Sequence, residues 1–343
     1  MKTICKVVDN NVNSQSNYAH AVDILNAGEV VAFPTETVYG LGAVATNDKA
    51  VKKIFEAKGR PSDNPLIVHI GDKQEVAHYI EDLPDVARKC MDLFWPGPLT
   101  MVMKVKPDVL AESVTAGLHT VGIRMPNHPV ALGLLQQLKK PLAAPSANRS
   151  GKPSPTEAIH VAEDLQGVIP YILDGGATGI GLESTVLDVT HEPPVILRPG
   201  GITKEMLEDA IGPVIQPTKL EQNMASTPKA PGMKYTHYAP NAPVYLIDCN
   251  EEKVTEAIQT LKMEGQKVAL LAPNHFVQSK ADYFFSLGEE GAKEEMGATL
   301  YNALRACDQT NATVILATVT STEGVGAAIM NRLEKASGGK WYK

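Results

Sequence analysis

Short apolar runs alternate with amphipathic helical patterns through residues 1–212, and this alternation restricts the possible folds more than any other feature. The pattern predicts a helix that closes near Gly28 and is followed by a buried strand. A second helix is predicted to begin at Asn47 or Asp48 and to end at Gly59. Strand-like runs such as "LTMVMKV", "TVGIRMP" and "PVILRPG" follow between further helical patterns. Strands that alternate with helices indicate an α/β protein, here with one large mixed sheet.

The alternation stops in residues 213–241, which are rich in proline and show no periodicity. Such composition is typical of a linker. The alternation then resumes, and residues 242–343 are predicted to form a smaller, Rossmann-like α/β domain with mostly parallel strands. A chain of 343 residues has the length expected for about two domains. We therefore expect a first domain over 1–212, a linker over 213–241 and a second domain over 242–343.

The composition is that of an ordinary globular protein, with 43% hydrophobic and 21% charged residues. A net charge of −7 disfavours a protein that holds nucleic acid mainly by neutralising phosphates. The four cysteines form no CxxC pair, so neither a zinc site nor a disulfide framework is indicated. The start of the chain lacks the apolar run of a signal peptide, and no apolar stretch is long enough to cross a bilayer. We expect a soluble, cytoplasmic protein with no membrane partner.

Several common catalytic motifs are absent from the sequence. There is no GxxxxGK[ST] and therefore no P-loop, and neither HExxH nor GxSxG occurs. The glycines of "GGATGIG" at residues 175–181 have the wrong spacing for a dinucleotide-binding fingerprint. The chemistry must lie in less familiar patterns.

The stretch "EAKGRPSDNPLIVHI" gathers cations at the end of a predicted helix. Gly59 can leave the helix in a left-handed conformation, and Pro61 favours an extended Arg60. The side chains of Lys58 and Arg60 would then point the same way, toward an anionic ligand. The alternative is that Lys58 complements the helix C-terminus while Arg60 is solvated at the surface.

Other polar side chains also end apolar runs. Ser146 and Asn148 are two residues apart after "PLAAP", where they would either face a ligand or serve a turn. Arg124 and Arg198 each end a strand-like run before a proline, and His69 lies within the apolar "LIVHI". Each has an ordinary structural interpretation, a snorkelling arginine or a core histidine. Together they would form a site for a polyanion if these strand ends meet.

The motifs "PTETVYGLG", "KGRPSDNPLIVHI", "FWPGPLT", "VGIRMP", "APSANRSGKPSPT" and "ILRPGG" resemble the YrdC-type threonylcarbamoyl-AMP synthases. The linker "APGMKYTHYAP" and the second domain resemble the long, two-domain form of that family. The resemblance spans nearly the whole chain, and the family's KxR…SxN pattern is intact as Lys58, Arg60, Ser146 and Asn148, which the resemblance makes the catalytic residues.

The resemblance implies that ATP, L-threonine and bicarbonate form L-threonylcarbamoyl-AMP and pyrophosphate, and that the threonylcarbamoyl group later reaches an adenosine of tRNA. It implies that ATP contacts Arg60, Asn64, Thr120, Ser146, Ser154, Arg198 and Tyr238. It implies that L-threonine contacts Thr37, His69, Arg124, Ser184 and the backbone near Ala144. Thr35 is an alternative to Thr37, because it lies two residues away on the same side of an extended chain.

The resemblance also implies Mg²⁺, held mainly by the phosphates of ATP and by water, because no compact carboxylate cluster is apparent. A downstream tRNA threonylcarbamoyl transferase is the implied protein partner, and direct tRNA binding is left open. One alternative is an RNA-binding module that makes no adenylate. Another is a carbamoyl-phosphate-using relative of the HypF type, which the absence of CxxC pairs disfavours.

The linker carries aromatic side chains in an otherwise polar stretch, Tyr235, His237 and Tyr238 beside Lys234. Long ordered loops are often functional lids, and aromatic rings can cover the apolar parts of a ligand. We expect residues 213–241 to act as a lid that excludes water from a labile anhydride. The alternative is that the aromatic rings simply pin the linker to one domain.

Overall fold

The computed structural model describes residues 2–8, 17–217 and 238–343. The chain forms two compact units, of which the first comprises residues 1–150, 155–179 and 183–234. The second comprises residues 151–154, 180–182 and 235–343. The expected division at 1–212, 213–241 and 242–343 remains a prediction, and most of the expected linker lies outside the described residues. In the described part, no helix has the length and apolarity needed to span a membrane.

The first unit is built on a mixed sheet of ten strands in the order β1-β8-β2-β3-β7-β4-β6-β5-β9-β10. Parallel and antiparallel neighbours both occur, for example β4 parallel to β6 and antiparallel to β7. The strands are β1 (Ile4–Val7), β2 (Val31–Phe33), β3 (Gly40–Val44), β4 (Ile67–His69), β5 (Leu99–Lys104), β6 (Thr120–Arg124), β7 (Leu142–Ala143), β8 (Tyr171–Asp174), β9 (Thr185–Asp188) and β10 (Val195–Arg198). The expected large mixed sheet is confirmed.

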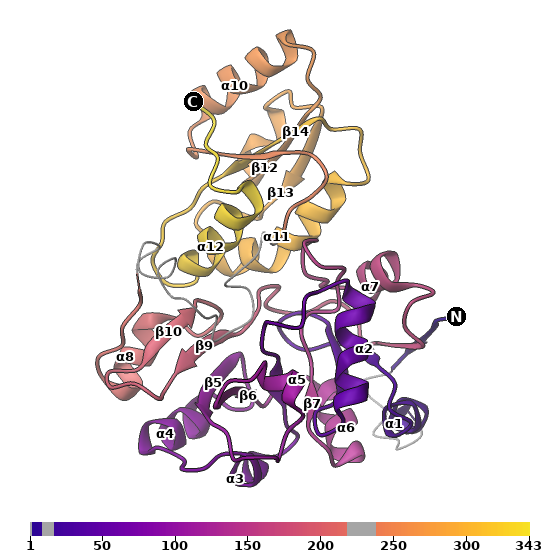
Figure 1. Cartoon of the computed structure of the whole chain (residues 1–343). Coiled ribbons are helices and arrows are strands. Elements are labelled where there is room, and N and C mark those ends of the chain that lie inside the picture. The colour runs from indigo at the N-terminus through magenta and orange to yellow at the C-terminus, as the bar shows by residue number, and fades with distance from the viewer. Residues whose placement is uncertain (1, 9–16, 218–237) are drawn as a thin grey trace. The chain divides into compact units, whose positions relative to one another are not determined.

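Helices cover both faces of this sheet (Figure 1). They are α1 (Ala19–Asn26), α2 (Asp48–Lys58), α3 (Val76–Tyr79), α4 (Asp85–Phe94), α5 (Glu112–Thr115), α6 (Pro129–Leu138), α7 (Ala158–Leu165) and α8 (Lys204–Ile211), with a 3₁₀ turn η2 (Lys73–Glu75). Neighbouring residues of a strand point to opposite faces, so Val31 and Phe33 pack with α1 and α6. Ala32, between them, belongs to the larger core that includes residues of α2, α4 and α7.

Helix α2 has the ends that its sequence predicts. The Asn47 side chain accepts a hydrogen bond from the backbone N–H of Ala50, which satisfies one of the unpaired donors of the first turn. Gly59 terminates the helix with φ 59° and ψ 38°, a left-handed conformation that costs glycine little. The chain therefore turns sharply after Lys58 and runs toward β4.

The second unit contains a separate sheet of four parallel strands in the order β11-β14-β12-β13. Its strands are β11 (Val244–Ile247), β12 (Val268–Ala272), β13 (Tyr283–Ser286) and β14 (Val314–Thr318). Its helices are α10 (Glu251–Met263), α11 (Lys293–Cys307) and α12 (Gly326–Ser337), with a 3₁₀ segment η3 (Asn274–Gln278). The expected Rossmann-like α/β domain is confirmed.

His69 occupies the middle of the large sheet, at the end of β4. It is 4% exposed, it is registered opposite Arg124 of β6, and its ring meets Phe33 edge-on with the centroids 6.0 Å apart. Burial, reinforced by the nearby positive charge of Arg124, lowers the pKa of His69 from 6.5 to about 3. The imidazole is therefore neutral at physiological pH.

This depressed pKa predicts an acid-sensitive first unit. The unfolded chain binds a proton at His69 below about pH 6.5, whereas the folded chain does so only near pH 3. The contribution of a neutral His69 to the unfolding free energy is therefore fully present above pH 6.5 and is lost as the pH falls toward 3. Between pH 7 and pH 5 the loss should be about 2 kcal/mol. We expect His69→Gln to reduce the change in unfolding free energy between these pH values by that amount.

The measurement is urea unfolding followed by Trp95 fluorescence in a Trp341→Phe background. Trp95 belongs to the first unit and Trp341 to the second, so the remaining signal reports the first unit alone. His78→Gln, at an exposed position of α3, is the matched control and should keep the full pH dependence. Equal pH dependence in His69→Gln and the unsubstituted chain would show that the argument is wrong.

Candidate active site

Lys58 is buried at the C-terminal end of α2, with 2% of its surface exposed. Its ammonium donates hydrogen bonds to the backbone carbonyls of Ser146 and Asn148, each at 2.6 Å. The alternative in which Lys58 merely complements the helix C-terminus is therefore wrong, because the ammonium also binds two carbonyls of a distant loop. A buried ammonium is tolerated because carbonyl oxygens replace its hydration shell. Lys58 thus fastens the loop after β7 to the end of α2.

Ser146 and Asn148 lie on the loop that Lys58 holds. The Ser146 hydroxyl donates to Asn148 Oδ1 at 2.6 Å, and the Asn148 amide donates to the Arg149 carbonyl at 2.9 Å. Ser146 also forms an isolated antiparallel bridge with Gly40, which continues the sheet beyond β7. The loop therefore combines turn hydrogen bonding with a fixed position beside β3. Through Lys58, the KxR and SxN motifs lie next to each other.

Arg124 forms a second buried cluster at the end of β6, where it is 3% exposed. Its Nη1 donates to Thr37 Oγ1 at 2.8 Å, and its Nη2 pairs with Glu36 Oε2 at 2.5 Å. The Thr37 hydroxyl in turn lies 2.8 Å from that of Thr35. The Thr35 hydroxyl donates a hydrogen bond to the Val38 carbonyl at 2.7 Å. Thr35 therefore stabilises the turn, whereas Thr37 contacts Arg124.

Glu36 is a site residue that the sequence reasoning missed. The available signal was the carboxylate of "TET", because a buried arginine at a strand end needs a nearby counter-charge. The pairing joins segments 88 positions apart in the chain, and no spacing rule in the sequence indicates which acid that would be.

Asn64 and Arg124 carry buried polar atoms that the described residues leave unsatisfied. Asn64 is fully buried, and neither its amide nitrogen nor its amide oxygen has a hydrogen-bond partner among the described residues. Arg124 Nε is likewise buried and without a partner in the described chain. Leaving a polar group buried and unsatisfied costs on the order of 1–3 kcal/mol. Both groups therefore favour a bound polar molecule that would satisfy them.

Arg198 and Ser184 form a third cluster, where β10 ends beside the start of β9. Arg198 donates from Nε and Nη2 to the Ser184 carbonyl at 3.1 and 2.9 Å, and from Nη2 to the Ser184 hydroxyl at 3.1 Å. The Ser184 hydroxyl also lies 2.8 Å from that of Thr100 in β5, a contact that the sequence did not indicate. A Cβ at Gly200 would lie 2.3 Å from the Thr185 backbone nitrogen, so only glycine lets the next turn approach this cluster.

The remaining expected residues occupy varied positions. Thr120 is half-buried at the start of β6, and the Ala144 backbone N–H donates to the Ile67 carbonyl at 2.9 Å. Arg60 is half-buried just after α2. Ser154 and Tyr238 belong to the second unit, whereas every other expected site residue belongs to the first.

Tyr238 is buried within the second unit in a left-handed conformation, with φ 67°. Its ring lies 5.1 Å from that of Tyr301, and the Arg332 guanidinium carbon is 6.0 Å from its centroid. Lys234, Tyr235 and His237 lie outside the described residues, as does most of the expected lid. The end of the expected linker is thus held by aromatic packing at Tyr238.

The residues of the first unit fit a nucleotide-bound metal better than a protein-bound one. No group of three or more His, Cys, Asp or Glu side chains in the described chain is arranged to hold a metal ion. Glu36, the carboxylate of the second cluster, is already paired with Arg124. A magnesium ion here would take its ligands mainly from phosphates and water.

Two family models match the chain in succession. The Sua5, YciO and YrdC model, described as telomere recombination, matches residues 23–200. The model described as the C-terminal domain of threonylcarbamoyl-AMP synthase matches residues 202–338. The chain is also 51% identical to the threonylcarbamoyl-AMP synthase of Bacillus subtilis strain 168, over 97% of this chain and 96% of that protein.

Solved structures agree with this assignment. The crystal structure of Pyrococcus abyssi Sua5 complexed with L-threonine superposes with a TM-score of 0.93 at 45% identity, covering 99% of both chains. Escherichia coli YciO matches 58% of this chain and 96% of its own, with a TM-score of 0.51 at 25% identity. The resemblance drawn from the KxR and SxN motifs is confirmed, and the chain belongs to the Sua5, YciO and YrdC family in the two-domain form of the threonylcarbamoyl-AMP synthases.

Proposed function

We propose that this protein is an L-threonylcarbamoyladenylate synthase, which converts L-threonine, bicarbonate and ATP to L-threonylcarbamoyl-AMP and pyrophosphate. The structural observation that carries the proposal is the set of buried, unsatisfied polar groups at Asn64 and Arg124, within a chain similar throughout to named synthases. The enzyme is of the nucleotidyltransferase type, because its product is an adenylate. The P. abyssi relative was crystallised with L-threonine, which supports threonine as the amino-acid substrate.

Threonine is assigned to the cluster around Arg124. The guanidinium offers a planar fork that matches a carboxylate, with Nε buried and available. Glu36 and Thr37 hold the other side of the fork, so the arginine is oriented before the substrate arrives. A neutral His69 adds a polar group without a second positive charge, and Ser184 and the Ala144 backbone complete the proposed contacts.

ATP is assigned to the neighbouring cationic and amide groups. Arg60 and Arg198 supply charge for the phosphates, and Asn64 supplies donor and acceptor atoms with no partner among the described residues. Lys58 acts as a positioning residue, because its ammonium holds the carbonyls on either side of the Ser146–Asn148 turn. The proposed contacts are completed by Thr120, Ser146, Ser154 and Tyr238.

The reaction requires little covalent help from the protein. Bicarbonate supplies CO₂ by losing hydroxide. The threonine amine adds to that CO₂ and loses a proton to the hydroxide, which gives a carbamate and water. A carbamate oxygen then bonds to the α-phosphorus while the bond to the β-phosphate oxygen breaks, and pyrophosphate leaves. The protein orients the carbamate through Arg124 and stabilises the developing charge with cations and hydroxyls. Magnesium, carried by the ATP phosphates, would neutralise charge on the leaving group.

The wider setting is also part of the proposal. The adenylate would pass to a tRNA threonylcarbamoyl transferase in the cytoplasm, and residues 213–241 would shield the labile anhydride from water.

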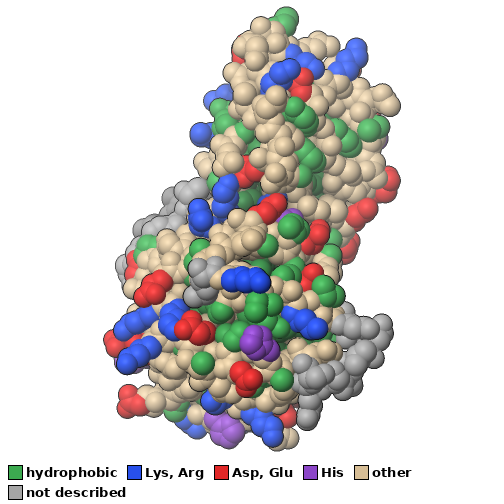
Figure 2. Space-filling model, turned by 90° about the vertical axis from the view of Figure 1, so that its right-hand side faces the viewer, with side chains coloured by type: hydrophobic (Ala, Val, Ile, Leu, Met, Phe, Trp, Pro, Cys, Tyr) green, Lys and Arg blue, Asp and Glu red, His purple; other side chains and the backbone are tan. Residues whose placement is uncertain are grey.

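A purely RNA-binding role is less well supported. On the face shown in Figure 2, basic and acidic side chains are interspersed, and the sequence as a whole is acidic.

The reaction itself gives the first test. The full chain is incubated with ATP, Mg²⁺ and labelled bicarbonate together with each amino acid in turn. We expect a labelled adenylate and stoichiometric pyrophosphate with L-threonine. An RNA-binding module would yield neither product while binding RNA with steep salt dependence. Absence of any amino-acid-dependent adenylate would reject the proposed function.

The fastening role of Lys58 gives the second test. Lys58→Met and Arg60→Ala should each lower kcat/KM at least about a hundredfold, since a charged group in a closed site contributes on the order of 2–4 kcal/mol. Lys58→Met should also lower the unfolding free energy, by about 1–3 kcal/mol, because it leaves two backbone carbonyls without their donor. Lys52→Met, at an exposed position on the same helix, is the control. Activity near normal in Lys58→Met would remove this lysine from the site.

The arginine fork gives the third test. Arg124→Lys keeps the charge but cannot reproduce two parallel hydrogen bonds to a carboxylate. The KM for threonine should rise at least about tenfold more than the KM for ATP. Arg88→Lys, on the exposed surface of α4, should change neither constant. A proportionate rise in both KM values would contradict the assignment of threonine to Arg124.

A further inference from the structure

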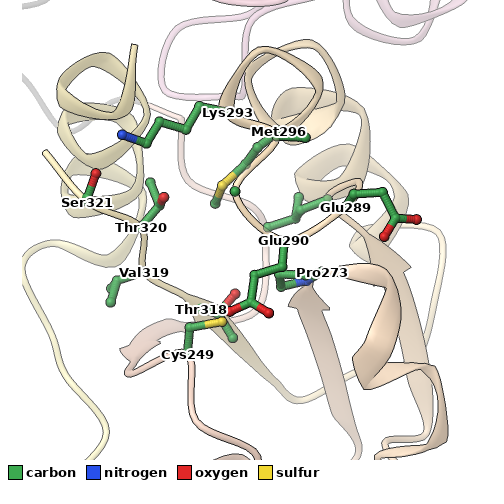
Figure 3. Close-up of a pocket in the computed structure, with 13 residues that line it drawn as sticks. Cys249, Pro273, Glu289, Glu290, Lys293, Met296, Thr318, Val319, Thr320 and Ser321 are labelled. Carbon is green, nitrogen blue, oxygen red and sulfur yellow. The ribbon is translucent and has the colours of Figure 1, made fainter. Parts of the chain in front are cut away.

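A cavity of about 340 Å³ lies in the second unit, at the carboxyl edge of its four-stranded sheet (Figure 3). Its volume falls within the range of small-molecule sites, which begins at roughly 300 Å³. No residue proposed for threonylcarbamoyl-AMP synthesis lines it. The lining residues are Cys249, Pro273, Leu287, Glu289, Glu290, Gly291, Ala292, Lys293, Met296, Thr318, Val319, Thr320 and Ser321.

The cavity lies where the strand order reverses. From β11 the chain moves outward to β12 and β13, then returns to place β14 between β11 and β12. Pro273 directly follows β12, and Thr318–Ser321 end and follow β14, so the two strands that flank the reversal both contribute to the lining. In open parallel sheets, connections diverge at such a point and leave a crevice, which is where ligands bind.

The two sides of the cavity carry opposite charges, and the first side carries a lysine. Lys293 begins α11, a helix of 15 residues, and its side chain extends on the same side of the cavity as Thr320 and Ser321 (Figure 3). Its ammonium donates to the Glu323 carbonyl at 2.9 Å, which anchors it on this side. The positive end of the α11 dipole adds to the charge of Lys293. This side favours an anionic group flanked by hydroxyls.

The opposite side carries a carboxylate. Glu290 lies beside Thr318 and Cys249 at the foot of the view in Figure 3, and the side chain of Met296 projects between this side and Lys293. Glu289 accepts a hydrogen bond from the Asn274 amide at 2.6 Å, and the exposed Glu290 carboxylate lies 3.8 Å from His275 Nδ1. Leu287, Met296 and Val319 add apolar surface to the lining.

We infer that this cavity binds a ribonucleoside 5′-monophosphate. The phosphate would lie against Lys293, Thr320, Ser321 and the start of α11. The ribose hydroxyls would donate to Glu290, as an acidic residue does in Rossmann-type nucleotide sites. The base would pack on the apolar surface of Met296 and its neighbours.

Hydrogen–deuterium exchange of the full chain with 5′-AMP tests the site by its location. We expect AMP to slow exchange in residues 287–296 and 318–326. Adenosine and inorganic phosphate, each lacking half of the proposed contacts, should need at least about tenfold higher concentrations for the same protection. AMP bound at the proposed active site would instead protect residues near Lys58 and Ser146, so the two sites are read separately.

Two variants decide whether the assigned contacts are real. Lys293→Met and Glu290→Gln should each weaken AMP protection of 287–296 and 318–326 at least about tenfold. Lys262→Met, at the far end of α10, should leave it unchanged. Protection confined to the first unit, absence of protection, or equal protection in Lys293→Met would overturn the inference.

Synthesis is measured on the same samples. Threonine-dependent pyrophosphate release should persist in both variants, because neither residue belongs to the proposed active site. Intact synthesis without protection would reject this cavity as a nucleotide site and leave the proposed function standing. AMP protection without adenylate synthesis in the unsubstituted chain would support the nucleotide site and reject the proposed function.

Discussion

The buried ammonium of Lys58 is the interaction on which the arrangement of the active site depends. Taking a lysine charge out of water is costly, and the structure offsets that cost with two backbone carbonyls at 2.6 Å. Because those carbonyls belong to Ser146 and Asn148, the same contact sets the loop after β7 against the end of α2. The segment that carries Arg60 and Asn64 leaves α2 at this point, so its starting position is set as well.

A second buried cation, Arg124, organises the sheet centre in a different way. It is paired with a carboxylate and a hydroxyl, and its positive charge helps keep His69 neutral. A site that must hold both a carboxylate and a triphosphate needs charge, yet too many cations would repel one another. A neutral histidine beside a paired arginine supplies a polar group and a cation without adding a second positive charge. The low dielectric constant of the protein interior strengthens the remaining electrostatic interactions.

Much of this could be predicted from the sequence, because the relevant signals are local. The Asn47 cap and the left-handed Gly59 follow from propensities acting within one turn, and the strand ends follow from apolar runs that stop at proline. The grouping of Lys58 with Ser146 and Asn148 rested on a resemblance, because each motif taken alone also allowed an ordinary structural role, a helix C-terminus for Lys58 and a turn for Ser146 and Asn148. Glu36 and Thr100 were missed because their partners come from strands distant in the chain.

The sequence by itself determined the α/β class of the fold and the residue types available for chemistry, because hydrophobic periodicity and composition can be read without the structure. Only the tertiary structure decided what those residues do. It buried Lys58 and gave its ammonium to carbonyls, and it chose Glu36 as the partner of Arg124. It also formed a cavity at the carboxyl ends of β12 and β14, where the connections after these two strands diverge. The physical reason is that burial and pairing depend on which strands become neighbours, and strand order is a property of the folded sheet.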